Sequence, residues 1–315
     1  IYNSSLMEKL RIVFMGTPEF AAHILERLIS EGFNIVCVVT QPDKPFGRKK
    51  ILKQSEVKEV ALKHNIEVFQ PIKIREDYQK IVDINPDLII TAAYGQIVPQ
   101  AVLDAPKIMA VNIHGSLLPK YRGGAPIHYS VINGDEKTGV TIMEMIDKMD
   151  AGGIITQAEF PIGFTDNVGD VYNTMKQVGA DLIVETWPSL LENKFKVIAQ
   201  DESLVTYSPN IKPSEEIIDF NKPVLDVYNQ IRGLNPFPIA YFKYEGKRFK
   251  VYSSEIKMES SVVGMIMNVS KEGIEIGCED GIIVLKEIQP EGKKRIKVAD
   301  YVNGNIEFEV NKMCD

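Results

Sequence analysis

The chain has 315 residues, 44% of them hydrophobic, and a formal net charge of −7 at pH 7. This length favours two domains, and the acidic balance is unlike that of a general nucleic-acid binder. Three well-separated cysteines argue against a disulfide framework and for a reducing compartment. Because there is no signal-peptide pattern and no apolar run near the ~20 residues that span a bilayer, we expect a cytoplasmic protein. Residues 1–6 precede Met7 and are left out of the fold prediction.

The first half of the chain alternates short apolar runs with amphipathic stretches. Arg11–Met15 is apolar after its first residue and ends at Gly16, as expected of a buried parallel strand. We expect Thr17 to cap the next helix, with Pro18 at its first position and Gly32 after its end. A strand at 36–39, a helix at 56–64 and a strand at 87–91 follow. This alternation predicts an α/β fold with a doubly wound, Rossmann-like parallel sheet.

The turn after the first strand argues against a dinucleotide site. It reads Gly-Thr-Pro-Glu-Phe-Ala over residues 16–21, with one glycine where such a site has three. Proline and phenylalanine stand where a pyrophosphate needs bare backbone, and Glu19 would repel phosphate groups. The four histidines and three cysteines show no metal-ligand spacing, so no metal is expected.

Beyond Thr206 the pattern changes. Residues 207–222 have little periodicity and predict a linker, after which Pro223 begins a short helix that Gly233 would end. Short strands separated by turn residues follow, and residues 240–252 have the pattern of a β-hairpin. We therefore expect a catalytic domain at 7–206, a linker at 207–222 and a small β-barrel domain at 223–315.

Two polar residues end an apolar run in the middle of the chain. Asn112 and His114 follow Ile108–Val111, and if this run is a strand, their side chains share one face. An amide donor beside an imidazole, with a carboxylate within reach, suits a reaction that puts negative charge on a carbonyl oxygen. For an isolated pair, a strand-end cap and a satisfied histidine are the commoner roles.

The surrounding residues resemble one known family. Residues 112–119 (NIHGSLLP), 121–127 (YRGGAPI), 139–141 (GVT) and 149–152 (MDAG) are similar to the core of the folate-dependent formyltransferases. The similarity is closest to the members that formylate methionyl-tRNA. It extends from Leu10 to near the C-terminus and includes residues 16–21, 40–48 and 232–238. Several motifs in the family's order make the resemblance specific.

The resemblance implies a reaction and the roles of three residues. The donor would be 10-formyltetrahydrofolate, and the acceptor would be the α-amino group of methionine on initiator tRNA. Asn112 and a protonated His114 would donate hydrogen bonds to the oxygen that becomes anionic. Asp150 would orient the imidazole, favour its charged form and take up the proton of the attacking amine. No covalent enzyme intermediate is required.

The resemblance also implies a folate site. In the family the pterin lies in a pocket made largely of backbone, with apolar side chains over its faces. Tyr94 and Ile97 could instead be core residues. The residues expected to contact folate are Tyr94, Gly95, Gln96, Ile97, Ser116, Leu117, Leu118, Pro119, Asp147, Lys148 and Met149.

Basic residues form three clusters in this acidic chain, one in the loop after residue 43 and two, at 243–250 and 293–297, in the expected C-terminal barrel. In the family the loop after residues 41–43 enters the acceptor stem of initiator tRNA, with the residue matching Arg48 as its main reader. This loop lacks a small residue that many members have after the arginine, so its path can differ. The C-terminal barrel is expected to be OB-like. From charge alone, solvated loops explain these clusters equally well. The residues expected to bind tRNA are Lys44, Arg48, Lys49, Lys50, Lys293, Lys294 and Arg295.

Two other classes of function remain open. A small-amine transformylase or a formyl-folate hydrolase would need Asn112, His114 and Asp150 but neither the basic loop nor the barrel. A non-catalytic RNA-binding module would need the barrel and the basic clusters but not these three residues. The chain has both features, which favours the tRNA enzyme. We expect it to act as a monomer, without a metal or a membrane.

Overall fold

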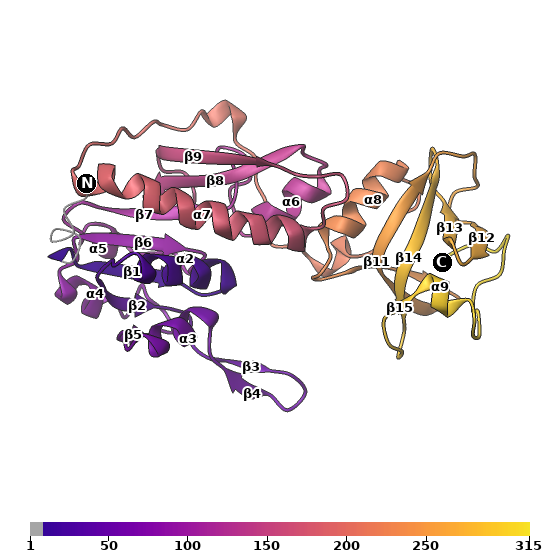
Figure 1. Cartoon of the computed structure of the whole chain (residues 1–315), viewed down its shortest axis with the longest axis horizontal. Helices are drawn as coiled ribbons and strands as arrows, with labels where there is room; N and C mark the ends of the chain where they lie inside the picture. Colours follow the sequence, from indigo (N-terminus) through magenta and orange to yellow (C-terminus); the bar gives the residue numbers. More distant parts are fainter. Residues whose placement is uncertain (1–8) are drawn as a thin grey trace. The chain divides into compact units, whose positions relative to one another are not determined.

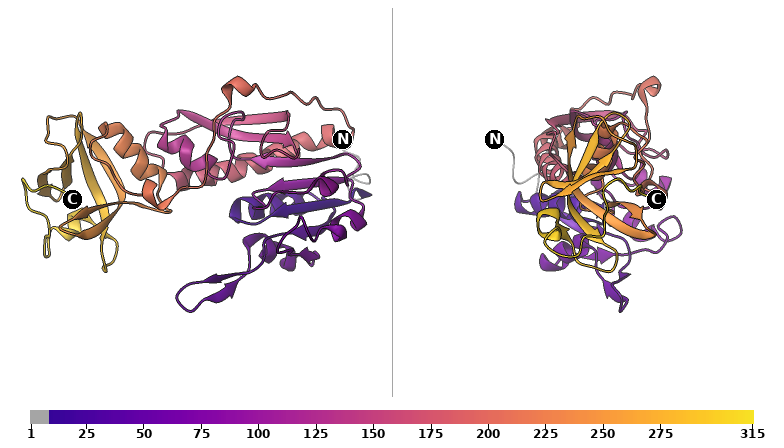
Figure 2. Two further views of the ribbon diagram at one scale, coloured as in Figure 1. Left: turned by 180° about the vertical axis from the view of Figure 1, so that it is seen from behind. Right: turned by 90° about the vertical axis from the view of Figure 1, so that its right-hand side faces the viewer.

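The computed structural model describes residues 9–315, which form two compact units (Figures 1 and 2). The first unit comprises the chain up to Gly123, Thr138–Phe160 and Tyr172–Tyr207. The second unit comprises Gly124–Lys137, Pro161–Val171 and Ser208–Asp315, so the chain passes between the units several times. Residues 1–6 and Met7, the expected start of the catalytic domain, lie outside the described residues.

The first unit is built on a seven-stranded sheet with the order β5-β2-β1-β6-β7-β8-β9. Neighbouring strands from β5 to β7 are parallel, whereas β8 runs antiparallel to β7. The predicted α/β fold with a parallel sheet is therefore confirmed, with an antiparallel extension that the sequence patterns did not predict. The strands are β1 (Ile12–Gly16), β2 (Ile35–Val39), β5 (Val68–Phe69), β6 (Leu88–Ala92), β7 (Met109–His114), β8 (Lys137–Glu144) and β9 (Ile154–Pro161).

Helices cover both faces of this sheet. On one face, α7 packs against α2 and β7, since a Cβ added at Gly179 would lie 3.4 Å from Ile24 and 3.6 Å from Ile113. On the other face, Ile81 of α4 and Val102 of α5 join the core formed by alternate strand residues. This is the arrangement of a doubly wound sheet. The helices of this unit are α2 (Glu19–Ser30), α3 (Glu56–Lys63), α4 (Gln79–Ile84), α5 (Gln100–Leu103), most of α7 (Val168–Leu191) and the short 3-10 turn η1 (Glu202–Leu204).

The turn after β1 differs from the prediction in one respect. Helix α2 begins at Glu19 with Pro18 as its N-cap, so Thr17 is not the capping residue. The Thr17 hydroxyl instead donates to the carbonyl oxygen of Tyr94 at 2.8 Å and thereby joins the turns after β1 and β6. Gly16 is required by space, because a Cβ there would lie 2.7 Å from the Ala92 carbonyl oxygen.

The basic loop after residue 43 contains an antiparallel hairpin, β3 (Lys44–Phe46) and β4 (Ile51–Lys53), that extends away from the sheet (Figure 1). Phe46 pairs with Ile51, and both side chains are 66% exposed. A polar, proline- and glycine-containing segment gave no strand signal in the sequence, because neither face of this hairpin is buried.

The second unit holds an antiparallel sheet with the order β10-β11-β14-β13-β12, and β15 pairs with β14. The predicted hairpin is present, with Glu245 and Gly246 as its turn. Aromatic residues fill the core of the second unit. The ring centroid of Phe308 lies 4.7 Å from that of Phe249 and 4.8 Å from that of Tyr244. The strands are β10 (Ala240–Tyr244), β11 (Lys247–Lys257), β12 (Ile266–Ser270), β13 (Gly273–Gly277), β14 (Ile282–Pro290) and β15 (Ile296–Lys297).

Two helices of the second unit touch at a glycine. Gly233 is the last residue of α8 and lies against α6, where an added Cβ would lie 3.0 Å from the backbone nitrogen of Ile132. Its role is therefore close packing, and Leu234 takes the C-cap position that Gly233 was predicted to fill. The helices here are α6 (Pro126–Ile132), the start of α7, the 3-10 turn η2 (Pro213–Glu215), α8 (Val224–Gly233) and α9 (Val298–Tyr301).

Candidate active site

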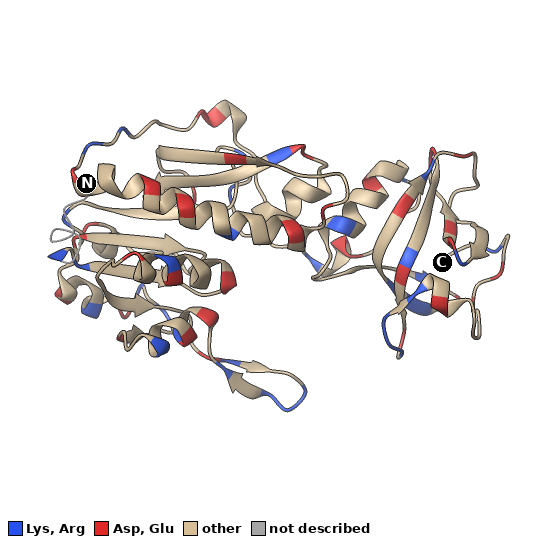
Figure 3. Ribbon diagram, viewed as in Figure 1, with Lys and Arg blue, Asp and Glu red and all other residues tan. Residues whose placement is uncertain are grey.

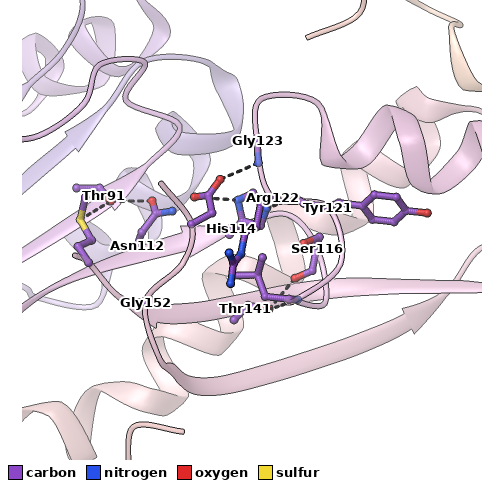
Figure 4. Close-up of polar contacts among 12 residues, drawn as sticks. Thr91, Asn112, His114, Ser116, Tyr121, Arg122, Gly123, Thr141 and Gly152 are labelled. Atoms are coloured by element: carbon purple, nitrogen blue, oxygen red, sulfur yellow. Dashed lines mark hydrogen bonds and ion pairs between the residues drawn. The ribbon is translucent and has the colours of Figure 1, made fainter. Parts of the chain in front are cut away.

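Strand β7 carries the predicted pair at its carboxyl end. Asn112 is half-buried, and His114 is 6% exposed. Thr91 of β6 lies opposite Asn112 in the parallel register and donates its hydroxyl proton to Asn112 Oδ1 at 2.7 Å (Figure 4). Because this bond holds the oxygen of the amide, the Nδ2 group of Asn112 is left to donate. We find no partner for Nδ2 within residues 9–315.

The imidazole of His114 is fixed from two sides. Its Nε2 lies 2.7 Å from the carbonyl oxygen of Tyr121, and since a carbonyl only accepts, Nε2 carries a proton. Its Nδ1 lies 3.7 Å from Oδ1 of Asp150. Both side chains are largely buried, with 7% of the His114 side chain and 11% of the Asp150 side chain exposed. The structure therefore brings together the three residues predicted to be catalytic.

Asp150 is held at its second oxygen as well. Its Oδ2 accepts a hydrogen bond from the backbone N–H of Gly123 at 2.9 Å (Figure 4). Oδ1 is left facing the imidazole, so the two oxygens have different partners. A charged carboxylate in this position can orient the ring and accept a proton from a group that approaches it.

The loop after β6 keeps its polar side chains turned inward. The Gln96 amide donates to Gln41 Oε1 at 2.9 Å and to the Pro71 carbonyl, and it accepts from the Ile74 N–H. Tyr94 is 4% exposed, whereas Ile97 is 68% exposed. Any contact of this loop with a ligand would therefore use its backbone and Ile97 rather than the side chain of Gln96.

The segment after His114 is tightly bound to its surroundings. The Ser116 hydroxyl is buried and donates to the Lys120 carbonyl at 2.6 Å, so it is not poised as a nucleophile. Leu117 lies beside Gly139, Leu118 is 3% exposed, and the Leu118–Pro119 peptide is cis. On the loop before Asp150, Asp147, Lys148 and Met149 are exposed.

The expected tRNA-binding residues fall into two groups with different surroundings. Lys44, Arg48, Lys49 and Lys50 are exposed on the β3–β4 hairpin, and no ion pair engages them in the described structure (Figure 3). In the second unit Lys293 pairs with Glu307 at 2.9 Å. Arg295 binds Glu287 through two hydrogen bonds and lies 3.9 Å from the centre of the Tyr252 ring. Lys294 is exposed and forms no ion pair with any described residue.

Residues 9–315 contain no group of three or more His, Cys, Asp or Glu side chains arranged to hold a metal ion. In the same range, every helix is too short or too polar to cross a membrane.

The sequence matches a known family over most of its length. Residues 10–187 match the formyl transferase family, and residues 210–305 match the formyl transferase C-terminal domain. The chain belongs to the formyl transferase family. Curated relatives of this formyl transferase include the methionyl-tRNA formyltransferase of Ligilactobacillus salivarius, 48% identical over 93% of this chain and 94% of the relative. That of Bacillus subtilis is 47% identical with the same coverage.

Solved structures of more distant proteins share the fold of this formyl transferase. An N-formyltransferase from Helicobacter canadensis, in complex with folinic acid and dTDP-3-aminofucose, has a TM-score of 0.69 at 21% identity. The match covers 88% of this chain and 98% of that one. HypX from Aquifex aeolicus, in complex with tetrahydrofolic acid, has a TM-score of 0.64 at 16% identity and covers 97% of this chain and 50% of its own.

The sequence patterns did not predict the roles of three residues around the site of this formyl transferase. Thr91 orients Asn112, Tyr121 binds His114, and Gly123 binds Asp150. Thr91 had a usable signal, because it is the one polar residue of the buried strand β6, which pairs with β7. Tyr121 and Gly123 act through backbone atoms, which the residue type does not reveal.

Proposed function

We infer that this chain transfers the formyl group of 10-formyltetrahydrofolate to the α-amino group of methionyl-initiator tRNA. The observation that carries this proposal is the meeting of Asn112, His114 and Asp150 at the carboxyl end of β7, with His114 Nδ1 3.7 Å from Asp150 Oδ1. The acceptor is inferred from the curated relatives, which are 47–48% identical over 93% of this chain and are named methionyl-tRNA formyltransferase.

The chemistry needs donors for a developing negative charge. When an amine attacks a formyl carbon, the formyl oxygen becomes anionic, and preorganised hydrogen-bond donors stabilise it. Asn112 Nδ2 is such a donor, because Thr91 holds Oδ1 and thereby fixes the rotation of the amide. His114 can contribute only through Nδ1, since Tyr121 occupies Nε2.

The attacking amine must also lose a proton, and the departing folate nitrogen must gain one. Asp150 places its Oδ1 3.7 Å from Nδ1 of the imidazole. The backbone N–H of Gly123 bonds to the other oxygen, Oδ2, so Oδ1 can accept a proton. We assign to Asp150 the uptake of the amine's proton, directly or through water, and its return to the departing folate nitrogen. No nucleophile on the enzyme is needed, in keeping with the engaged hydroxyl of Ser116.

The residues present fit a folate. Loop 94–97 and loop 147–149 combine exposed apolar side chains, Ile97 and Met149, with backbone groups. Backbone donors and acceptors suit the polar edge of a pterin, and apolar side chains suit its faces. The folates in the complexes of the two distant neighbours support the same class of co-substrate, and 10-formyltetrahydrofolate would supply the formyl group.

We assign the tRNA to the β3–β4 hairpin and to the C-terminal sheet. Four basic residues of the hairpin, led by Arg48, have no ion pair within residues 9–315 and offer positive charge to a phosphate backbone, and Lys294 offers a further contact. We also propose that the sheet of residues 223–315 is OB-like, that residues 207–222 link it to the catalytic part beginning at Met7, and that the enzyme acts as a cytoplasmic monomer.

The proposal is tested with the purified chain, 10-formyltetrahydrofolate and charged initiator tRNA, with formyl-methionine measured after hydrolysis of the ester. We expect formylation of methionyl-initiator tRNA. Methionyl-elongator tRNA and a nucleotide-linked amino sugar serve as competing acceptors. Transfer to the amino sugar in place of the tRNA would overturn the proposal in favour of a small-amine transformylase.

A further inference from the structure

Asp150 has an unusual backbone conformation. Its φ is 53°, in the left-handed region that L-residues other than glycine seldom occupy. Two residues later, a Cβ added at Gly152 would lie 1.7 Å from the Glu144 carbonyl oxygen, so the chain passes very close to β8 there. A residue in such a conformation persists only where its surroundings hold it.

One side chain holds this segment by its backbone. The Nε2 group of Gln200 donates to the carbonyl oxygens of both Asp150 and Gly152, each at 2.8 Å. Gln200 is 8% exposed, so water has little access to replace these bonds. The two carbonyl groups on either side of residue 151 are therefore fixed to a single amide.

A buried arginine sets the orientation of that amide. Arg122 is 1% exposed and donates to Gln200 Oε1 from Nε at 3.1 Å and from Nη2 at 2.9 Å. Because a guanidinium only donates, the oxygen of Gln200 must face Arg122 and its NH2 group must face the carbonyls. The charge of Arg122 is balanced by Glu202, whose hydrogen bonds with the guanidinium lower the pKa of its carboxyl group.

The segment that holds Gln200 also contacts the carboxylate of Asp150. Gly123, next to Arg122 in the sequence, donates its N–H to Asp150 Oδ2 at 2.9 Å. Residues 122 and 123 thus support Asp150 twice, at its side chain directly and at its backbone through Gln200. Active-site groups need such support to stay within a fraction of an ångström of their working position.

We propose that Gln200 is a positioning residue for Asp150 and that Arg122 fixes the Gln200 amide for this task. The proposal rests on the function proposed above and adds to it two residues outside the reacting set. Without the Gln200 bonds, the backbone of Asp150 is free to leave the left-handed region. The carboxylate then turns away from His114 Nδ1.

The test is Gln200→Leu, with Gln230→Leu as the matched control. Gln230 also donates its amide to two backbone carbonyls, of Glu215 and Ile217, each at 3.0 Å, and lies in the other unit. A displacement of about 1 Å in a catalytic group can cost on the order of 10²-fold in rate. We expect Gln200→Leu to lower kcat about 10- to 100-fold, with KM for both substrates nearly unchanged, whereas Gln230→Leu keeps kcat.

A double variant separates positioning from general damage. If Gln200 acts through Asp150, Gln200→Leu should cause little further loss in single-turnover rate in an Asp150→Asn background. The same factor of loss in both backgrounds would overturn the proposal. Gln200→Glu provides a second variant should the leucine variant fold poorly, because it keeps the contact with Arg122 and removes both donors to the carbonyls.

Amide hydrogen exchange gives a readout that does not depend on catalysis. We expect faster exchange in peptides that contain Gly123 and residues 150–153 in Gln200→Leu, but not in Gln230→Leu. Unchanged exchange there would overturn the inference even if the full chain formylates tRNA. Faster exchange in a chain that does not transfer formyl groups would instead support the inference and contradict the proposed function.

Discussion

Thr91 donates its hydroxyl proton to Oδ1 of Asn112 at 2.7 Å, across the parallel pair β6 and β7. A primary amide without this bond could present either its oxygen or its nitrogen to a ligand. The bond makes Asn112 a donor, which is the role that an anionic oxygen requires. The polarity of the site is thus set by a residue that need not touch the substrates.

The first prediction concerns this bond. Thr91→Val keeps the shape of the side chain and removes its hydroxyl, so the Asn112 amide can rotate and present its oxygen. We expect kcat to fall by roughly 10-fold, less than the typical cost of deleting an oxyanion donor. Thr186→Val is the control, because Thr186 is also buried and its hydroxyl donates within α7, to the Leu182 carbonyl. Equal kcat values in the two variants would contradict this role of Thr91.

The second prediction concerns the three reacting residues themselves. Asn112→Ala should lose on the order of 10²- to 10³-fold in kcat, the usual cost of one oxyanion donor. His114→Ala and Asp150→Ala should nearly abolish transfer. Circular dichroism and the thermal midpoint check that each variant is folded. Because the three act as a unit, a double variant should lose much less than the product of the single losses. Normal turnover in any folded single variant would refute the site.

The sequence predicted the centre of this site better than its surroundings. Asn112 and His114 were located by strand periodicity, and Asp150 by the family motif, and all three converge in the structure. The Thr17 cap was wrong because the Thr17 hydroxyl bonds to Tyr94, 77 residues away. No local pattern reports such a bond. The β3–β4 hairpin was missed because it has no buried face, and periodicity signals only burial.

The basic clusters illustrate a second limit of the sequence. The sequence does not distinguish between three consecutive basic residues, Lys293, Lys294 and Arg295. In the structure, acidic partners from elsewhere in the unit engage Lys293 and Arg295. Of these three residues, only Lys294 has no ion pair with a described residue. The net charge of a short segment therefore overstates the number of its basic side chains that are free to bind RNA phosphates.

The third prediction concerns the cysteines. Burial raises the pKa of the Cys37 thiol to about 11 and those of Cys278 and Cys314 to about 12. At pH 8 about 0.1% of the Cys37 thiol and about 0.01% of the other two are then ionised, and the thiolate is the reactive form. We expect iodoacetamide to label the native chain slowly and all three cysteines quickly in denaturant, as counted by mass spectrometry.

Formyl transfer should survive this treatment, since the proposed chemistry uses no thiol. The control is the same incubation without reagent. Rapid labelling of one cysteine in step with the loss of activity would contradict the prediction and point to a thiol in the reaction.

The last prediction separates the two basic regions and the two substrates. Arg48 is exposed and unpaired in the described structure, whereas Arg295 is already bound by Glu287 and stacked on Tyr252. An arginine free of acidic partners can offer its full charge to phosphate, so Arg48→Ala should raise KM for methionyl-tRNA strongly and Arg295→Ala only slightly. Lys294→Ala should fall between them. Each lost phosphate contact should reduce the slope of log K against log salt by roughly 0.7 to 0.9.

Folate is the internal control for this experiment. Its affinity, measured by fluorescence titration, should be the same in all these variants, because none of the residues belongs to the loops assigned to folate.

Arg75→Ala is the charge-matched control, since Arg75 is exposed and without an ion pair in the described residues but lies outside the hairpin. It should keep the KM for tRNA, because a general loss of one positive charge from an acidic chain changes long-range attraction only weakly at physiological salt. If Arg75→Ala weakened tRNA binding as much as Arg48→Ala, the hairpin would not be a specific reader. If Arg48→Ala formylated methionyl-tRNA as well as the unaltered chain, the acceptor would have to be sought among smaller amines.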